Sequence, residues 1–393
     1  MRTQVGIVGA GPAGLMLSHL LHQSGIDSVL VESRSREYVE QRIRAGVLEQ
    51  GTVDMLNESG VGQRMNEQGL VHGGIDLRFG GRSRRVDFED LTGKRVMVYG
   101  QHEVVKDLIA RRTADGGKLA FDVSETTVDR LDGDRPVIRY RDAAGDRVEV
   151  ECDFIAGCDG FHGICRPAIP EGVLSYYDRV YPFAWLGILA ESKPVQEELI
   201  YANHERGFTL ISLRSPTITR MYVQCAPDEN IDEWPDERIW NEIRARLDGE
   251  DVPNVVPGPI LQKGVTAMRS FVVEPMQFGK LFLAGDSAHI VPPTGAKGMN
   301  LAMADVRILA RAFESHYHAG DDTGLARYSD VCLKRIWKTQ RFSWWMTSML
   351  HRFDDTGPFE HRVQIAELDY VTSSRAASTT LAENYVGLPF EEV

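Results

Sequence analysis

Cysteine is scarce in this chain, and no two cysteines stand in a Cys-x-x-Cys arrangement. The 393 residues include only Cys152, Cys158, Cys165, Cys225 and Cys332. An odd number without close pairs argues against a disulfide framework and against a zinc site, so no metal is expected. Free cysteines are typical of a reducing compartment, and we therefore expect the protein to be cytoplasmic.

The chain also lacks an excess of positive charge and any long apolar run. Its 44 Lys and Arg residues face 57 Asp and Glu residues, which gives a formal net charge of −13 at pH 7. This balance disfavours binding to nucleic acids and to anionic membranes, and no apolar run approaches the length of a membrane span. A chain of this length exceeds a single hydrophobic core, so two or three lobes are expected.

The most informative segment that is present is a glycine motif close to the N-terminus. An apolar run ends at Gly9, and Gly11 and Gly14 follow before a helical pattern starts. A second apolar run ends in Glu32. Glycines at this spacing permit a tight turn and a close approach of the backbone to a pyrophosphate, while the acid accepts from a ribose hydroxyl. The motif predicts a dinucleotide site between a strand and a helix.

Two later segments also place an acidic residue at or just after the end of an apolar run. The apolar run 154–158 is followed by Asp159, and the run 281–284 is followed by a glycine and Asp286. Short apolar runs are typical of buried parallel strands, and ligands of open α/β sheets bind beyond the carboxyl ends of such strands. Together with the acid of the first motif, these residues suggest one extended cofactor with several hydroxyl groups. Each acid on its own can also be a turn or cap residue.

The pattern changes between residues 176 and 275, where apolar and polar residues alternate as in antiparallel strands. We therefore expect an α/β (α+β) fold with a Rossmann-like cofactor domain. That domain would comprise residues 1–175 with 276–320, and an inserted, mainly antiparallel sheet would comprise 176–275. Helical spacing of apolar residues after position 300 predicts a C-terminal helical region over 321–393.

These motifs resemble those of the single-component FAD-dependent aromatic hydroxylases. The glycine motif is similar to the family's ADP-binding motif, Cys158-Asp159-Gly160 to a motif that serves both FAD and the nicotinamide cofactor, and Gly285-Asp286 to one that meets the ribityl chain of FAD. Four further segments look like the members that act on 4-hydroxybenzoate, namely 42–50, 159–162, 292–298 and 383–389. The resemblance spans nearly the whole chain.

The resemblance implies an FAD-binding domain, a substrate-binding sheet domain and a C-terminal interface region in a homodimer. It also implies a reaction, in which NADPH reduces FAD and O₂ then gives a flavin C4a-hydroperoxide. One oxygen atom would pass to the ring carbon next to the phenol carbon, so that 4-hydroxybenzoate becomes 3,4-dihydroxybenzoate.

A substrate clamp is suggested by two pairs of residues with the spacing of one strand face. Ser212 and Arg214 are two positions apart, as are Arg220 and Tyr222, and a hairpin would place all four on one face. Spacing alone favours an exposed polar strand face over a clamp. The resemblance assigns Ser212, Arg214 and Tyr222 to the substrate carboxylate, and it places Arg220 near the flavin, where a cation stabilises the negative charge of reduced flavin.

The resemblance also assigns a path for the phenol proton. Tyr201 would contact the substrate hydroxyl, Tyr385 would relay the proton, and His72 would lie at the solvent end of the relay. Histidine suits this role because its ordinary pKa lies near neutrality, although an ordinary loop histidine gives the same sequence. The backbone at Pro293 would lie beside the reacting ring.

The remaining cofactor contacts are implied by the same resemblance. Gly298 would let backbone amides approach the flavin, Asn300 would help to fix the ring, and Arg44 would offset the pyrophosphate charge, whereas Arg42 can equally form a surface ion pair. The complete set for FAD is Gly9, Gly11, Gly14, Glu32, Arg42, Arg44, Gln101, Asp159, Gly160, Arg220, Gly285, Asp286, Gly298 and Asn300.

For the nicotinamide cofactor, the matching positions are His162 and Arg269, with Arg34 and Tyr38 in the segment that selects the 2′-phosphate. Ser33 departs from the best-known form of the family, which has arginine there. NADPH is expected, and mixed use with NADH stays open.

Two alternatives remain at this stage. One is a related flavin hydroxylase that acts on another hydroxybenzoate or on an aminobenzoate, because the clamp suits any benzoate. The other is a binding protein with the same fold and no turnover. The intact glycine motifs and the three strand-end acids argue against the second alternative.

Overall fold

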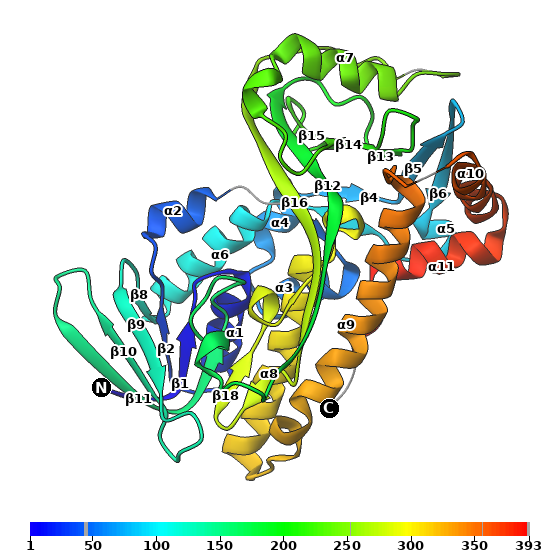
Figure 1. Cartoon of the computed structure of the whole chain (residues 1–393). Helices are drawn as coiled ribbons and strands as arrows, with labels where there is room; N and C mark the ends of the chain where they lie inside the picture. The colour runs from blue at the N-terminus through cyan, green and yellow to red at the C-terminus, as the bar shows by residue number, and fades with distance from the viewer. Residues whose placement is uncertain (43–45, 252, 356, 391–393) are drawn as a thin grey trace.

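The first of two large sheets carries the glycine motif. This sheet forms the lower left part of Figure 1. The computed structural model describes residues 1–42, 46–251, 253–355 and 357–390. The strands β18, β11, β1, β2 and β8 of this sheet run parallel, as predicted from the short apolar runs. In spatial order the sheet contains β17 (Gln277–Phe278), β18 (Leu281–Leu283), β11 (Arg147–Gly157), β1 (Arg2–Val8), β2 (Ser28–Val31) and β8 (Lys118–Ala120), with β10 (Val137–Arg141) paired to β11 and β9 (Ser124–Asp129) paired to β10.

Helices pack against this sheet and help to bury two of its inner strands. β2 and β18 are buried at every residue, the pattern of parallel strands that are covered on both faces. α1 (Pro12–Gln23) follows β1 directly and packs against α6 (Gln101–Ala114) and α8 (Gly298–Ala319). The other helices that precede α6 in the chain are α2 (Arg36–Gln41), α3 (Gln50–Glu58), α4 (Gln63–Gln68) and α5 (Phe88–Thr92).

The second large sheet is mainly antiparallel. Its spatial order is β19 (His289–Ile290), β16 (Ile260–Glu274), β12 (Ser175–Glu191), β15 (Ile218–Cys225), β14 (Thr209–Leu213), β13 (Leu199–Ala202), β5 (Gly74–Phe79) and β6 (Arg82–Asp87). Only the pair of β13 and β5 is parallel among the described strands of this sheet. β5, β6 and β19 join it from outside residues 176–275, and the domain boundaries themselves stay a prediction. α7 (Asp236–Arg246) packs its buried residues Ile239, Trp240 and Ile243 on one face of this sheet.

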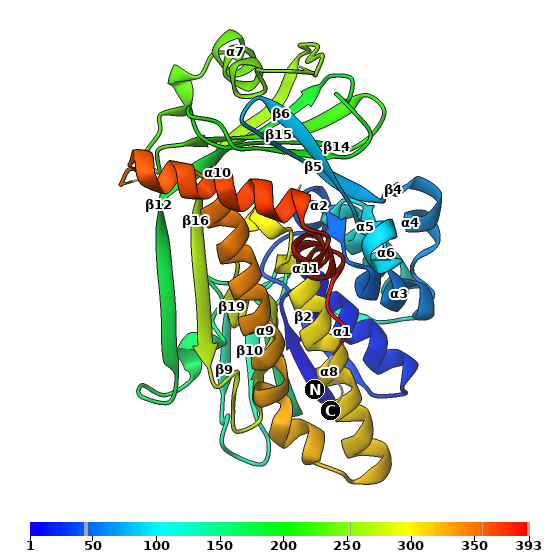
Figure 2. The same cartoon turned by 90° about the vertical axis from the view of Figure 1, so that its right-hand side faces the viewer.

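Two long strands connect the halves of the molecule. β12 has 17 residues and β16 has 15, and Figures 1 and 2 show them running side by side from the lower body into the upper sheet. A third, small sheet is formed by β3 (Val47–Leu48), β7 (Val96–Val98) and β4 (Leu70–His72).

The C-terminal region is helical, as predicted. α9 (Thr323–Leu350) packs along α8, and α10 (Pro358–Ser373) contacts both α9 and α11 (Arg375–Val386). Figure 2 shows α10 crossing the end of α9 below the second sheet. None of the described helices combines the length and the apolar character that crossing a membrane would require. The mixed fold of a cofactor sheet, an antiparallel sheet and terminal helices confirms the predicted α/β (α+β) class.

Candidate active site

The three predicted strand-end acids lie at one edge of the first sheet. Glu32 follows β2, Asp159 comes shortly after β11, and Asp286 lies after β18 in the short helix η3 (Gly285–Ser287). β18, β11, β1 and β2 are consecutive neighbours and parallel. Their carboxyl ends therefore meet on the side where open α/β sheets bind ligands.

The turn between β1 and α1 requires glycine at two positions and leaves room at a third. Gly9 has φ +106°, and a Cβ atom there would lie 2.4 Å from the carbonyl oxygen of Cys158. A Cβ atom at Gly14 would lie 2.0 Å from the carbonyl oxygen of Gly9. A Cβ atom at Gly11 would instead meet nothing within 4 Å. Gly11 is the N-cap of α1 and offers no side chain, so the first N–H groups of the helix remain available to an anion.

The carboxylate of Glu32 is fixed beside this turn. Its Oε2 atom accepts from the backbone N–H of Ala10 at 2.7 Å. Its Oε1 atom accepts from the backbone N–H of Arg34 at 2.8 Å and from the Ser33 hydroxyl at 3.3 Å. Because a carboxylate has about four acceptor positions, Glu32 is oriented by the protein and still able to accept from a ligand hydroxyl.

Asp159 has one oxygen engaged and one without a partner. Oδ2 accepts from the backbone N–H of Cys165 at 2.8 Å, whereas Oδ1 is buried and has no hydrogen-bond partner among the described residues. Burial raises the pKa of this carboxyl group, and the hydrogen bonds from Cys165 oppose the shift. Buried acceptors are normally paired, so Oδ1 indicates a position for a ligand donor. Gly160 follows with φ +76°.

Asp286 is exposed. The turn that carries it is fixed by a buried pair of side chains, Asp305 and His289, which was not predicted from the sequence. Gly285 has φ +66°, and its N–H donates to Oδ2 of Asp305 at 2.9 Å. The Nε2 atom of His289 lies 2.6 Å from the same oxygen. Asp305 and His289 are both buried, so the pair fixes the backbone on either side of Asp286.

Together these residues fit a dinucleotide cofactor such as FAD. Open space at the N-terminus of α1 suits a pyrophosphate, and three acids along one edge suit hydroxyl groups spread over an extended molecule. A second helix also begins with free space, because a Cβ atom at Gly298 would meet nothing within 4 Å. Gln101 is the first residue of α6 and is half-buried, and Arg42 is exposed at the end of α2. Arg44 lies outside the described residues.

The predicted clamp residues lie on the hairpin of β14 and β15. The register pairs Ser212 with Arg220 and Leu210 with Tyr222, which agrees with the predicted hairpin. Arg214 follows β14, and the residue as a whole is half-buried, but its Nε and Nη1 atoms are shielded from solvent and have no partner in the described structure. Burial lowers the pKa of this guanidinium, while the neighbouring Tyr222 opposes the shift. A buried cation with unused N–H groups is suited to an anion.

Arg220 extends the same positively charged region. Its guanidinium carbon lies 5.1 Å from the ring centre of Tyr222, and its Nη1 atom is buried without a partner among the described atoms. Gly187 makes room for it, since a Cβ atom there would lie 2.9 Å from Nη2 of Arg220. Behind the clamp, Trp185 packs on Tyr222 with ring centres 4.8 Å apart and donates to Nε2 of His351 at 2.7 Å.

The predicted relay tyrosines are in direct contact. The hydroxyl oxygens of Tyr201 on β13 and Tyr385 on α11 are 2.6 Å apart, and each residue is 1% exposed. Burial raises the pKa of both phenols; for Tyr201 the neighbouring Tyr385 adds to this. Phe88 stacks on Tyr385 with ring centres 4.9 Å apart. Two buried hydroxyl groups in contact can pass a proton without exposing a charge to an apolar core.

His72, at the end of β4, is buried, and neither ring nitrogen has a partner within the described residues. Burial lowers its pKa to about 4; Glu198 opposes the shift and Arg214 strengthens it. The imidazole is therefore neutral at physiological pH. This form can both accept and donate a proton, although no described contact joins His72 to the tyrosine pair.

The loop that begins at Pro292 is anchored to α9. Pro293 opens the short helix η4 (Pro293–Gly295), and the hydroxyl oxygens of Thr294 and Thr347 lie 2.9 Å apart. A Cβ atom at Gly295 would lie 3.1 Å from Phe342 and 3.2 Å from the hydroxyl of Ser343. This close packing holds the backbone of Pro293 in one position.

Asn300 uses its whole amide within the protein. Oδ1 accepts from the N–H of Glu49 and from the hydroxyl of Thr52, each at 2.9 Å. Nδ2 donates to the carbonyl oxygens of Val47 and Ala296, each at 2.9 Å. The resemblance implies that Asn300 helps to fix the flavin ring, and because its amide is fully engaged we expect it to do so by holding the adjoining loop.

The residues predicted for the nicotinamide cofactor form two exposed groups. The guanidinium carbon of Arg34 lies 5.2 Å from the ring centre of Tyr38, and that of Arg42 lies 5.9 Å from the same ring. In the second group, Arg269 on β16 and His162 both pack on the ring of Phe161, at 4.8 Å and 4.9 Å.

Comparisons with known proteins agree with this geometry. Residues 2–343 match the family described as FAD binding domain. The chain is 49% identical over 392 residues to a protein of Acinetobacter baylyi named p-hydroxybenzoate hydroxylase, and the match covers 100% of this chain and 96% of that protein. A protein of Rhodococcus jostii named probable NADH-specific resorcinol 4-hydroxylase is 25% identical over 78% of this chain and 58% of its own length.

Among solved structures, p-nitrophenol 4-monooxygenase PnpA from Pseudomonas putida DLL-E4 superposes with a TM-score of 0.84. It is 18% identical in sequence, and the match covers 99% of both chains. At this identity the likeness concerns the fold. The family match over residues 2–343 and the relative that is 49% identical over the full chain establish the family as well as the fold. The chain therefore belongs to the FAD-binding-domain family and is one of its flavin-dependent aromatic hydroxylases.

Proposed function

We propose that this enzyme hydroxylates 4-hydroxybenzoate to 3,4-dihydroxybenzoate, using FAD, O₂ and NAD(P)H. One oxygen atom of O₂ enters the ring, and the other leaves as water with the two electrons from the nicotinamide. The name of the relative that is 49% identical over the full chain supports this substrate. The residues that would recognise the substrate support it independently.

The observation that carries the proposal is the buried guanidinium of Arg214. Nε and Nη1 have no partner among the described residues although both are shielded from solvent. Leaving charged donors unpaired inside a protein is costly unless a ligand completes them. A benzoate carboxylate would accept both N–H groups, with the hydroxyls of Ser212 and Tyr222 on the same hairpin face.

The contact between Tyr201 and Tyr385 supports a phenol at the other end of the ligand. Tyr201 would bind the phenol oxygen of the substrate, and Tyr385 would take its proton and pass it towards solvent, with His72 as a neutral acceptor at the far end. Removing this proton makes the ring carbon next to the phenol carbon more nucleophilic. A benzoate without a para donor would leave this hydroxyl pair unused, which favours a 4-substituted substrate.

FAD, when bound, supplies the redox chemistry that carries electrons from NAD(P)H to O₂ and an oxygen atom to the ring. The protein's contribution is to hold the cofactor through Gly11, Glu32, Asp159 and Asp286. Pro293 in its anchored loop would align the ring, and the cation of Arg220 would favour an anionic cofactor. The burial of Tyr201 and Tyr385 would exclude water from the phenol end of the substrate.

The reductant, the assembly and the cell compartment are parts of the same proposal. Arg34 and Arg42 beside Tyr38 support a site for the 2′-phosphate of NADPH, while Ser33 leaves room for NADH. All five cysteines are free and buried, which supports a cytoplasmic enzyme. We expect the active form to be a homodimer.

A substrate panel tests the proposal. Purified enzyme with FAD is given NADPH and each of 4-hydroxybenzoate, 3-hydroxybenzoate and 4-aminobenzoate, and both NADPH loss and hydroxylated product are measured. We expect 4-hydroxybenzoate to give about one product per NADPH. Coupled product from 3-hydroxybenzoate or 4-aminobenzoate alone would assign another benzoate, and a colourless protein without FAD would favour a binding protein.

A further inference from the structure

A buried group of three charges lies beneath the tyrosine pair and was not predicted from the sequence. Nζ of Lys297 donates to Oε1 of Glu49 at 2.7 Å, and Nη2 of Arg335 donates to Oε2 of Glu49 at 2.8 Å. The three residues are between 2% and 6% exposed. With two cations and one anion, each member depends on the others for its charge to be tolerated there.

This group is connected to the relay through Lys297. Its Nζ atom also donates to the backbone carbonyl of Tyr385 at 2.8 Å and lies 5.5 Å from the centre of the Tyr385 ring. A displacement of Lys297 therefore moves the last turn of α11 and with it the hydroxyl that meets Tyr201. A hydrogen bond of 2.6 Å between hydroxyl groups is sensitive to such a shift.

The residues that follow α11 hold the guanidinium of Arg335 in place. Nη1 of Arg335 donates to the carbonyl oxygens of Leu388 and Pro389 at 2.7 Å and 3.0 Å. Phe390 lies under the same guanidinium, with its ring centre 5.1 Å from the guanidinium carbon. We call residues 387–390 the C-terminal strap. It begins at Gly387, where φ is +101° and a Cβ atom would lie 2.3 Å from Oε2 of Glu49.

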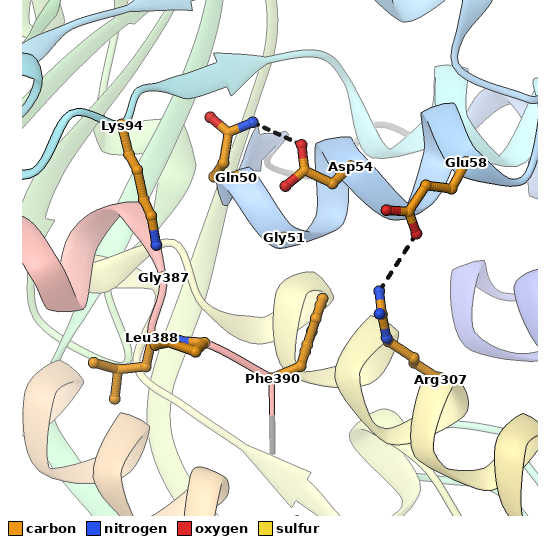
Figure 3. A pocket seen from close by; sticks show the side chains of 10 residues that line it. Gln50, Gly51, Asp54, Glu58, Lys94, Arg307, Gly387, Leu388 and Phe390 are labelled. Carbon is orange, nitrogen blue, oxygen red and sulfur yellow. Dashed lines mark hydrogen bonds and ion pairs between the residues drawn. The ribbon is translucent and has the colours of Figure 1, made fainter. Parts of the chain in front are cut away.

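The strap also closes the group from solvent. Figure 3 shows Leu388 and Phe390 in the wall of a pocket of about 220 Å³ between α3 and α8. The Phe390 ring rests on Gly51, where a Cβ atom would lie 2.7 Å from it, and Arg307 covers it at 4.7 Å. Leu388 lines this pocket and also borders the small space beside Glu49 and Arg335, so the strap is in contact with both.

We propose that Arg335 is a positioning residue for the proton relay and that the C-terminal strap holds it in that role. Arg335 fixes Glu49, Glu49 fixes Lys297, and Lys297 fixes the backbone of Tyr385. The clamp residue Arg214, which follows β14, makes no described contact with Arg335, Glu49 or Lys297 and is not part of this chain of contacts. The inference rests on the proposed function for its kinetic readout, but its structural readout is independent of that function.

The kinetic test is a double-mutant cycle with 4-hydroxybenzoate. Arg335→Gln is expected to lower the rate of coupled product formation roughly tenfold and to leave KM unchanged, since about 1 Å of displacement in a positioned group has effects of this size or larger. In a Tyr385→Phe background, which keeps the carbonyl but removes the hydroxyl, Arg335→Gln is expected to cost little more. An equal cost in both backgrounds would overturn the proposal.

Conservative and control variants distinguish a loss of rate caused by misplaced groups from one caused by misfolding. Arg335→Lys keeps the charge beside Glu49 and is expected to restore most of the rate, whereas Phe390→Ala, with every charge kept, is expected to lose roughly threefold. Arg307→Gln removes an equal charge that also packs on the Phe390 ring but makes no described contact with Glu49, and it is expected to change neither rate nor coupling. If Arg335→Gln does not fold, Phe390→Ala and Arg335→Lys carry the test.

Amide hydrogen exchange gives a readout without turnover. In the holoenzyme, exchange at residues 383–387 is expected to be faster in Arg335→Gln and Phe390→Ala than in wild type, and unchanged in Arg307→Gln. Unchanged exchange at these residues in the first two variants would refute the positioning role whatever the substrate is. Failure of the wild type to hydroxylate 4-hydroxybenzoate, with the exchange result as expected, would refute only the proposed function.

Discussion

The hydroxyl groups of Tyr201 and Tyr385 lie 2.6 Å apart although 184 positions separate the two residues in the chain. The contact joins the second sheet to the C-terminal helices in the interior of the protein, where both tyrosines are buried. It is the structural basis for the proposed removal of the phenol proton, and it makes the first prediction possible.

Tyr201→Phe is expected to separate reduction of the cofactor from hydroxylation. The phenol of the substrate would lose its partner, so the ring would be less activated while the cofactor still receives electrons from NADPH. We expect NADPH consumption to continue, with most of the electrons recovered as hydrogen peroxide. Peroxide and 3,4-dihydroxybenzoate are measured together, and a normal ratio of product to NADPH would contradict the relay.

Arg214→Ala is expected to weaken binding of 4-hydroxybenzoate by about 2–4 kcal/mol, because a buried carboxylate would lose its charged partner. The dissociation constant is measured by the change in flavin absorbance on titration with substrate. Phenol, which lacks the carboxylate, serves as the matched ligand and is expected to bind both forms equally. An unchanged dissociation constant for 4-hydroxybenzoate would rule out the clamp.

Gly11 and Gly14 are expected to respond differently to substitution by alanine. Gly14→Ala forces a Cβ atom to within 2.0 Å of a backbone oxygen, whereas the space at Gly11 is open. We expect Gly14→Ala to lower the melting temperature of the protein without FAD, and Gly11→Ala to leave it nearly unchanged. Gly11→Ala is expected to weaken FAD binding by roughly tenfold or more, about 1.4 kcal/mol; equal FAD affinity would show that the pyrophosphate lies elsewhere.

Ser33→Arg is expected to raise the preference for NADPH over NADH, measured as the ratio of kcat/KM values, by roughly tenfold. The added guanidinium would join Arg34 and Arg42 around Tyr38 and pair with the 2′-phosphate. Ser33→Gln adds similar length without charge and is the control. If both variants keep the wild-type ratio, the segment around α2 does not select the reductant.

Acidification is expected to destabilise the protein through His72. Its pKa is lowered to about 4 in the folded state, whereas an unfolded chain has the ordinary value near 6.5. Between these values the unfolded state binds more protons, so stability falls as pH drops from about 6.5 towards 4. His351, with a folded pKa of about 3, adds in the same direction.

For His72→Asn, the difference in unfolding free energy between pH 7 and pH 5 is expected to be smaller than in wild type by about 2 kcal/mol. Urea unfolding at the two pH values measures it. Identical pH dependence in the two proteins would mean that His72 is protonated as readily in the folded state as in the unfolded chain.

The cofactor edge was predictable because its signals are local. Gly9, Glu32 and Asp159 directly follow an apolar run, and Asp286 follows one after a single glycine. Parallel strands bring such ends together regardless of the order in which they pair. The face shared by Ser212 and Arg220 followed from the two-residue period of a strand, given a hairpin between them.

What the sequence did not predict depends on contacts between distant segments. The two hydrogen bonds to Glu49 come from residues 248 and 286 positions away, and no periodic pattern marks either partner. The buried pair of His289 and Asp305 could not be predicted for the same reason. In the sequence, His289 looks like a loop residue and Asp305 like a residue on the surface of a helix. Side-chain partners buried together are set by the final packing rather than by local spacing.

The hairpin of β17 and β18 belongs to the first sheet, yet the chain enters it from β16 and leaves it into β19, both of which belong to the second. Residues 275–276 and 284–288 are thus two short covalent links between the sheets, and the second link contains Asp286. Any rotation of one sheet against the other must twist these few backbone torsions. If Asp286 holds the hydroxyl chain of the cofactor, as proposed, the grip on the cofactor would be mechanically tied to the angle between the two halves of the molecule.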